Sequence, residues 1–281
     1  FTGTVSGGWA TGGLVGENKA SGVLRGCRTG GTVDGENRTG GLVGCNLGVI
    51  EDCENAAYVN IESVDPGIDL SDLDLTFSLD LTKLSELSTA NIATDTGGIA
   101  GCNAPSGALE RCVSGDWLLV NRSDSISVGT GGIIGMNESE KDLSFLLNRA
   151  FVGRQLRSAN TNRFAGGIIG TQTNRTTADW LIEGCINYGT VYGCLSHYSG
   201  GIIGQWTNNG GTLERCYNYG NLQTTFQANW VGASGGIVAQ LYHAASGQDF
   251  NILSCQNHGS LYGRDGRSVN DCANDSGGIL G

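Results

Sequence analysis

Proline, histidine, methionine and basic residues are scarce in this chain of 281 residues. It contains two prolines, three histidines and one methionine, and it has 16 Lys and Arg against 27 Asp and Glu. Glycine-rich linkers and disordered segments are usually rich in proline as well. With 48 glycines, so few prolines and 39% apolar residues, the composition favours a folded, turn-rich protein over a flexible linker.

Charge and hydropathy argue against two classes of partner. The net charge of −11 has the same sign as a phosphate backbone, so nucleic acid is not an expected ligand. No run approaches the roughly 20 apolar residues of a membrane span. No signal peptide precedes Phe1, and we therefore expect a fragment of a longer protein or a processed form.

A five-residue signature divides the chain into repeats. Two glycines, two aliphatic residues and a final Gly or Ala occur eight times, beginning at Gly12, Gly40, Gly97, Gly131, Gly166, Gly200, Gly235 and Gly277. Successive copies begin 28, 57, 34, 35, 34, 35 and 42 residues apart. Periods of this size are typical of solenoid proteins.

A second signature, Cys-x-Asn-x-Gly, follows within the repeats. It is complete at 185–189, 216–220 and 255–259, and looser in the earlier copies. A third short β-segment comes next, as at 189–193. Each repeat therefore contains three short strands separated by turns. Helical repeats of similar period are disfavoured, because glycine inside a helix costs about 1 kcal/mol relative to Ala.

Stacking of these repeats predicts one all-β domain over 1–281, a right-handed parallel β-helix of about seven to eight coils with three short strands each. Paired aliphatics such as Ile168 and Ile202 then form core columns, and the cysteines form a small apolar column. Asn187, Asn218 and Asn257 form an amide ladder at a turn. The 57-residue gap adds an insertion at about 61–93, predicted as a strand or short helix on the solenoid flank.

The two signatures together resemble the GLUG-type repeats of large surface and secreted proteins of bacteria, especially anaerobic gut Firmicutes. The resemblance covers nearly the whole chain outside the insertion. It implies an extracellular or cell-surface location. It implies no catalytic residue, because such repeats stand beside peptidase and adhesion modules without known catalytic residues of their own.

Aromatic residues gather in the C-terminal half, where the loops between strands lengthen. Exposed rings on a rigid scaffold are suited to sugar binding. The ligand-binding candidates are Trp180, Tyr198, Trp206, Trp230 and Tyr242. The alternative is structural, with Tyr188 and Tyr219 stacking in register as a ladder.

A column of carboxylates supports a second hypothesis. Glu183 and Glu214 each lie two residues before a cysteine of the repeat, so adjacent coils bring them together. Such a pair can share a proton for acid–base catalysis or hold calcium. The alternative is a surface column neutralised by Arg215 and its counterparts. The acidic cluster Asp65, Asp69, Asp72 and Asp74 lacks the glycine and final glutamate of a calcium loop and is interpreted as a solvated face.

Other chemistry finds little support in the pattern. There is no Gly-x-Ser-x-Gly motif, no cysteine pair at zinc spacing and no cofactor signature, so no catalytic residue, metal ligand or cofactor is assigned. Cys45 and Cys102 each follow a signature directly and stack in neighbouring coils, as a disulfide or as a free pair.

The function that fits best is a non-catalytic rigid spacer with a surface for a glycan or for a host or bacterial surface protein. The alternative is a carbohydrate-active β-helix enzyme, a glycoside hydrolase or polysaccharide lyase.

Overall fold

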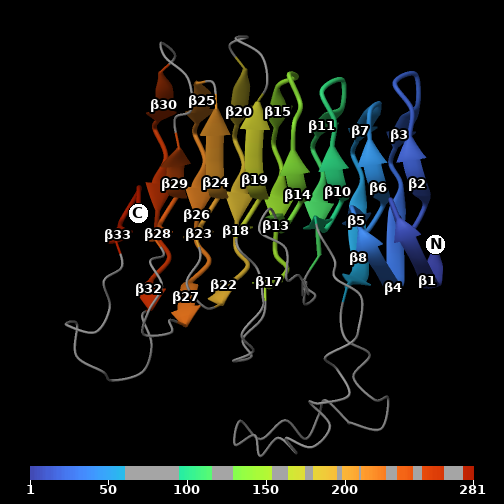
Figure 1. Cartoon of the computed structure of the whole chain (residues 1–281), viewed down its shortest axis with the longest axis horizontal. Helices are drawn as coiled ribbons and strands as arrows, with labels where there is room; N and C mark the ends of the chain where they lie inside the picture. Colours follow the sequence, from blue (N-terminus) through green and yellow to red (C-terminus); the bar gives the residue numbers. More distant parts are fainter. Residues whose placement is uncertain are drawn as a thin grey trace, which may run out of the picture.

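The chain forms a parallel β-solenoid in which coils stack side by side from the N-terminus to the C-terminus (Figure 1). The computed structural model describes residues 1–60, 95–115, 129–153, 164–174, 180–194, 198–208, 210–225, 233–242, 249–262 and 275–281. Within these ranges there are strands and no helix, and the strands pair in parallel to form five sheets, named A to E. The predicted β-solenoid is confirmed, and its handedness stays a prediction.

Each sheet takes one strand from each successive coil. The strands of sheet A are β1 (Thr2–Trp9), β4 (Arg28–Asn37), β8 (Glu54–Val59), β12 (Val113–Ser114), β16 (Leu147–Asn148), β21 (Ile186–Asn187), β26 (Tyr217–Asn218) and β31 (Gln256–Asn257). Sheet B contains β5 (Thr39–Gly40), β9 (Thr96–Gly97), β13 (Gly129–Gly131), β18 (Phe164–Gly166), β23 (Tyr198–Gly200), β28 (Ala233–Gly235) and β33 (Asp275–Gly277).

Sheets C to E complete the coils. Sheet C contains β2 (Val15–Asn18), β6 (Val43–Asn46), β10 (Ala100–Asn103), β14 (Ile134–Asn137), β19 (Ile169–Asn174), β24 (Ile203–Asn208) and β29 (Val238–Tyr242). Sheet D contains β3 (Val23–Arg25), β7 (Val49–Glu51), β11 (Ala108–Glu110), β15 (Leu143–Ser144), β20 (Leu181–Glu183), β25 (Gly211–Glu214) and β30 (Phe250–Leu253). Sheet E, formed by later coils, contains β17 (Val152–Gly153), β22 (Val191–Cys194), β27 (Leu222–Thr225) and β32 (Leu261–Tyr262).

The predicted number of strands per coil is wrong. The signature was expected to lie in one strand, but the chain bends at its second glycine and first aliphatic residue, as at Gly167 and Ile168. Sheet B ends at Gly166 and sheet C begins at Ile169. Each complete coil therefore contributes to four sheets, and the coils that reach sheet E contribute to five.

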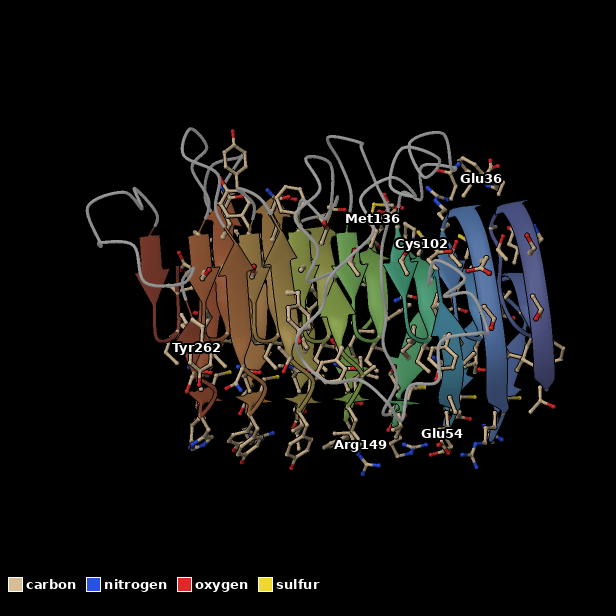
Figure 2. All side chains as sticks on the ribbon, turned by 90° about the horizontal axis from the view of Figure 1, so that it is seen from below. Glu36, Glu54, Cys102, Met136, Arg149 and Tyr262 are labelled. Atoms are coloured by element: carbon tan, nitrogen blue, oxygen red, sulfur yellow. The ribbon has the colours of Figure 1, made fainter. Side chains whose placement is uncertain are left out.

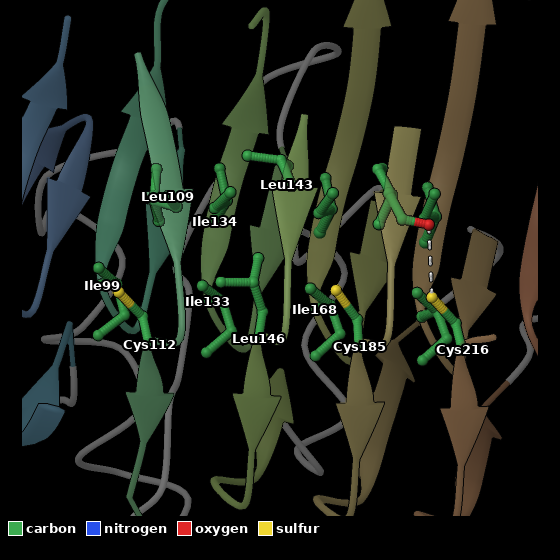
Figure 3. Close-up of a cluster of buried hydrophobic side chains, with 14 of the residues drawn as sticks. Ile99, Leu109, Cys112, Ile133, Ile134, Leu143, Leu146, Ile168, Cys185 and Cys216 are labelled. Atoms are coloured by element: carbon green, nitrogen blue, oxygen red, sulfur yellow. Dashed lines mark hydrogen bonds between the residues drawn. The ribbon is translucent and has the colours of Figure 1, made fainter. Parts of the chain in front are cut away.

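The core consists of the columns expected from the repeat (Figure 3). Both aliphatic residues of the signature are buried, as Ile168 and Ile169 illustrate. The cysteine column runs through Cys112, Leu146 and Cys185, with leucine filling the position that lacks sulfur. Because every coil supplies the same kind of side chain at the same position, the apolar columns are continuous along the stack.

One expected element lies outside the described residues, and one element that was not expected precedes the first signature. The insertion predicted at 61–93 lies outside the described residues. The segment before the first signature forms β1, which pairs with β4 in register from Thr2 and Gly30 onward. The sequence Gly-Thr-Val occurs at both 3–5 and 31–33, and this repetition indicates that β1 belongs to an additional, incomplete coil.

Candidate functional site

An asparagine turn orients a row of exposed aromatic residues. Asn187 Nδ2 donates to the Gly189 carbonyl at 2.9 Å, and the Gly189 N–H donates to Asn187 Oδ1 at 3.1 Å. The same Nδ2 also donates to Oδ1 of Asn218 in the next coil at 2.8 Å. The buried amide thus pairs the backbone polar groups of its own turn and also joins two coils. The residue after it therefore projects outward at a constant angle.

The residues after these asparagines form an exposed stack. The rings of Tyr188 and Tyr219 are 5.0 Å apart and inclined by 13°, and those of Tyr219 and His258 are 4.8 Å apart and inclined by 8°. Tyr188 is 52% exposed and Tyr219 43% exposed. Phe151 and Tyr262 are also exposed on the following segments of their coils. We call these five residues the aromatic edge.

The aromatic edge lies along one side of the solenoid. Asn148 is in register with Asn187, so Arg149 occupies the position before Tyr188 in the same column. Figure 2 labels Arg149 on the lower edge in that view, where a row of rings runs along the stack. The stack therefore begins beside a cation and continues through two tyrosines to a histidine.

Stacking within the aromatic edge decides which ring surfaces remain open. Tyr219 has a ring packed against each of its faces, and Tyr188 has one face covered. A pyranose that stacks on an aromatic plane needs an open face. The predicted structural ladder of Tyr188 and Tyr219 is confirmed, and its accessible parts are ring edges, phenol hydroxyls and the outer faces at its two ends.

Two of the predicted ligand-binding residues are core residues instead. Trp206 is 0% exposed and Trp180 is also buried. Their rings are 5.1 Å apart, and Phe250 packs edge-on against Trp206 at 4.9 Å. The prediction that these tryptophans lie exposed on loops is wrong, because Trp206 is in register with Gln172 on β19 and extends a buried column of sheet C.

Of the other three candidates, Tyr198 and Tyr242 lie on different sheets. Tyr198 is half-buried and stacks on Phe164 at 5.6 Å. Tyr242, at the end of β29, is exposed. Trp230 lies outside the described residues. Among the residues that the structure describes, Tyr242 is thus the one exposed candidate.

The carboxylate pair is present but is bridged by an arginine. Glu183 and Glu214 are in register on β20 and β25. The guanidinium of Arg215 forms ion pairs with both. The hydrogen bond to Glu183 raises the pKa of Arg215, so its charge is fixed between the two carboxylates. The alternative of a surface column neutralised by arginine is therefore what the geometry shows.

The same arrangement recurs nearer the N-terminus. Arg111 forms ion pairs with Glu51, Asp52 and Glu110, and Arg25 pairs with Glu51. The hydrogen bond from Arg111 lowers the pKa of Asp52. Exposed ion pairs of this kind contribute little to stability, so their main effect is to keep a column of carboxylates from repelling one another.

Comparison of the chain with protein-family models, with curated proteins and with solved structures gave no match. Over the described ranges, no group of three or more histidine, cysteine and carboxylate side chains is placed to hold a metal ion. No helix within those ranges is long and apolar enough to cross a membrane.

A second amide ladder was missed by the sequence analysis. Asn18, Asn46, Asn103 and Asn137 each donate to the next member of the column, at 2.7 to 2.9 Å, and the last of them donates to Gln172. The signal was present as Asn two residues after the final glycine of four signatures. His258 was likewise missed as the third member of the stack, although it follows Asn257 as Tyr219 follows Asn218.

Proposed function

We propose that this chain is a non-catalytic repeat segment of a bacterial surface or secreted protein, acting as a rigid spacer that presents the aromatic edge to a glycan or a surface protein. The observation that carries the proposal is the exposed stack of Tyr188, Tyr219 and His258 on a continuous scaffold. The location rests on the resemblance to GLUG-type repeats.

The scaffold supports the role of a spacer. Adjacent coils are joined by backbone hydrogen bonds in every sheet and by two buried amide ladders. Each coil contacts its neighbours along the stack, so the distance between the two ends is set by the number of coils. A structure of this kind holds two parts of a longer protein at a constant separation.

The aromatic edge supports the role in binding. Exposed aromatic rings are enriched where proteins bind ligands, since they bury large apolar areas and lose little side-chain entropy. The rings here are already immobilised by stacking, and Asn187 and Asn218 hold the turns that carry two of them. A ligand that runs along the solenoid can contact several of them at once.

An array of glycans and surface proteins, probed with the purified chain, tests this function. We expect at least one extended glycan or surface protein to bind. The double variant Tyr188→Ala with Tyr219→Ala is expected to bind it at least about tenfold more weakly. The matched control is Phe145→Ala, which removes an exposed ring outside the aromatic edge. Equal loss in both variants, or none in either, would contradict a role for the aromatic edge.

Hydrolysis and elimination assays on the hits test the non-catalytic part. We expect no turnover, since Arg215 bridges Glu183 and Glu214, the pair on which the enzyme alternative depends. Turnover of a hit that is lost in Glu183→Gln would establish the enzyme instead. A blank array with glycans and surface proteins would leave the spacer role alone.

A further inference from the structure

A small buried cluster apart from the main core contains two thiols. Cys45 on β6 and Cys102 on β10 are in register in neighbouring coils, and Ala104 and Met136 pack with them. Figure 2 labels Cys102 and Met136 near one another, away from the edge that carries Arg149. Cys102 is 0% exposed and Cys45 is 7% exposed, so Cys45 is the more accessible residue of the pair.

The two thiols contact each other and a cation. Cys45 and Cys102 are in register on neighbouring strands and pack in the same cluster. Arg38 Nη1 lies 3.9 Å from Cys45 Sγ. The contact with Cys102, together with the charge of Arg38, lowers the pKa of Cys45 to about 7 despite its burial. The same contact raises the pKa of Cys102, so Cys45 holds the thiolate and Cys102 the proton.

Other charged groups face the pair from the surrounding strands. Arg38 is the positive group, and it is held close to Cys45 at the bend between β4 and β5. Glu17 on β2, Asp95 before β9 and Glu138 after β14 are the acidic groups whose charges act on this cluster. The acidic groups oppose the thiolate and Arg38 favours it, so Arg38 is the side chain that stabilises a negative sulfur.

The geometry fits a disulfide between neighbouring coils. In-register residues on adjacent strands lie about 4.8 Å apart, and disulfides span Cα separations of about 4.4–6.8 Å. We propose that Cys45 and Cys102 form a redox-active dithiol, in which Cys45 is the attacking thiolate and Cys102 the resolving thiol, and which a peroxide or a small-molecule disulfide oxidises to an intrachain disulfide. This site is independent of what the aromatic edge binds.

The chemistry balances with either oxidant. With hydrogen peroxide, the Cys45 thiolate attacks one oxygen, the O–O bond breaks, and hydroxide leaves; Cys45 becomes a sulfenic acid. The Cys102 sulfur then displaces the sulfenic oxygen, which leaves as water with the proton from Cys102. With a small disulfide, the Cys45 thiolate attacks one sulfur, the S–S bond breaks, and one thiolate leaves. The Cys102 sulfur then attacks Cys45 of the mixed disulfide and the second small thiol leaves with the proton from Cys102. In both cases the protein loses two electrons and the oxidant gains them.

The chain supplies an internal control for this proposal. Cys185 and Cys216 are also one coil apart and also interact through their thiols, but both are 0% exposed in the main core, and burial raises the pKa of Cys216. Reactivity that depends on Arg38 and on access to Cys45 is therefore expected at the first pair and not at the second.

Oxidation of the reduced full chain with a small excess of hydrogen peroxide at pH 7 tests the proposal. After quenching with a thiol-blocking reagent, peptides are mapped by mass spectrometry, with cleavage after Glu51 separating Cys45 from Cys53. We expect a Cys45–Cys102 crosslink before any Cys185–Cys216 crosslink. In Cys102→Ser, a dimedone probe is expected to trap sulfenic acid on Cys45. A crosslink that forms first at Cys185–Cys216, or no crosslink at Cys45, overturns the proposal.

The variant Arg38→Gln separates activation from mere proximity. Its Cys45 is expected to react with iodoacetamide at pH 7 at least about threefold more slowly than in the wild type, and the midpoint of reactivity is expected to shift toward about 8.5, the pKa of a free thiol. Circular dichroism confirms that the variant is folded. An unchanged alkylation rate in the folded variant would show that Arg38 does not activate the thiol and would overturn this part.

Discussion

At the scale of single residues, the second glycine of five of the eight signatures lies directly against the asparagine of the same coil. A Cβ atom on Gly167 would lie 2.3 Å from Cγ of Asn187 and 2.1 Å from the carbonyl oxygen of Gly201. Gly132 and Gly201 meet Asn148 and Asn218 in the same way. The Gly-Gly signature and the Cys-x-Asn-x-Gly signature are therefore two halves of one contact.

Gly167→Ala is expected to destabilise the protein by about 1–3 kcal/mol or more, because neither the ladder nor the backbone of the next coil can move aside. The measurement is the free energy of unfolding in urea. Gly278→Ala is the matched control, since Gly278 has the same position in the last signature and nothing within 4 Å of an added Cβ. Similar losses in both variants would show that the glycine is needed for its backbone alone.

Asp95 is a buried carboxyl whose charge opposes folding. It is 5% exposed and accepts a hydrogen bond from the Gly129 N–H at 3.4 Å. Burial raises its pKa from 3.8 to about 7. The unfolded chain loses this proton at a lower pH than the folded chain, so stability is fully retained below about pH 4 and falls as pH rises toward 7.

We therefore expect the wild type to lose stability between pH 5 and pH 8 and Asp95→Asn to lose much less. At pH 8 the variant should be more stable, by up to about 4 kcal/mol. Asp52→Asn is the control: its carboxyl is exposed, and its pKa is lowered rather than raised. The measurement is the free energy of unfolding in urea at pH 5 and pH 8. A loss of stability in Asp95→Asn as large as that in the wild type would contradict the role of Asp95.

At the scale of elements, the amide ladder of sheet A has a gap. Asn55 and Asn148 are both in register with Ser114 on β12. The buried Ser114 Oγ finds no hydrogen-bond partner among the described residues. Gly98 faces Ser114 as Gly132 faces Asn148, so the space for an amide exists at this position.

Ser114→Asn is expected to raise the free energy of unfolding by about 1–2 kcal/mol, because each restored hydrogen bond contributes about 0.5–1.5 kcal/mol. Thermal unfolding of the variant, the wild type and Ser114→Ala provides the comparison. The alanine variant removes the unpaired hydroxyl without adding an amide and should be close to the wild type. An asparagine variant less stable than the alanine variant would show that the ladder cannot continue through this coil.

At the scale of the whole molecule, stability is shared between neighbouring coils. A central strand such as β14 is hydrogen-bonded to β10 on one side and β19 on the other. In this chain β1 and β33 each pair with one strand of their sheet. Repeat proteins open from such positions, because fewer contacts are broken there.

Hydrogen exchange is therefore expected to be slowest in the central coils and fastest at β1 and β33. The amides of Ile133, Ile168 and Ile202, which each donate to the next coil, are the reference for slow exchange. Exchange measured by mass spectrometry on peptides from each coil provides the profile. Equal protection in all coils would indicate one cooperative unit and would contradict independent coils.

Some parts of the structure were predictable because they repeat. The aliphatic pairs, the cysteine column and the asparagine turn follow from a local rule that applies in each coil. The burial of Trp206 was not predictable in this way, since it depends on the end of the amide ladder at Gln172 and on the rings of Trp180 and Phe250. The prediction of three strands per coil was also wrong, because the chain bends inside the signature as it passes from sheet B to sheet C.

The sequence by itself determined the solenoid, its repeat and the inward columns, because the short strands of one coil can bury their apolar faces only against the equivalent strands of neighbouring coils. The tertiary structure alone decided which side chains from different positions of the repeat meet. It brings Arg38 to Cys45, and it packs Trp206 against Trp180 and Phe250. The physical reason is register: loops and insertions of different lengths separate the coils along the chain, and only their stacking brings these residues together.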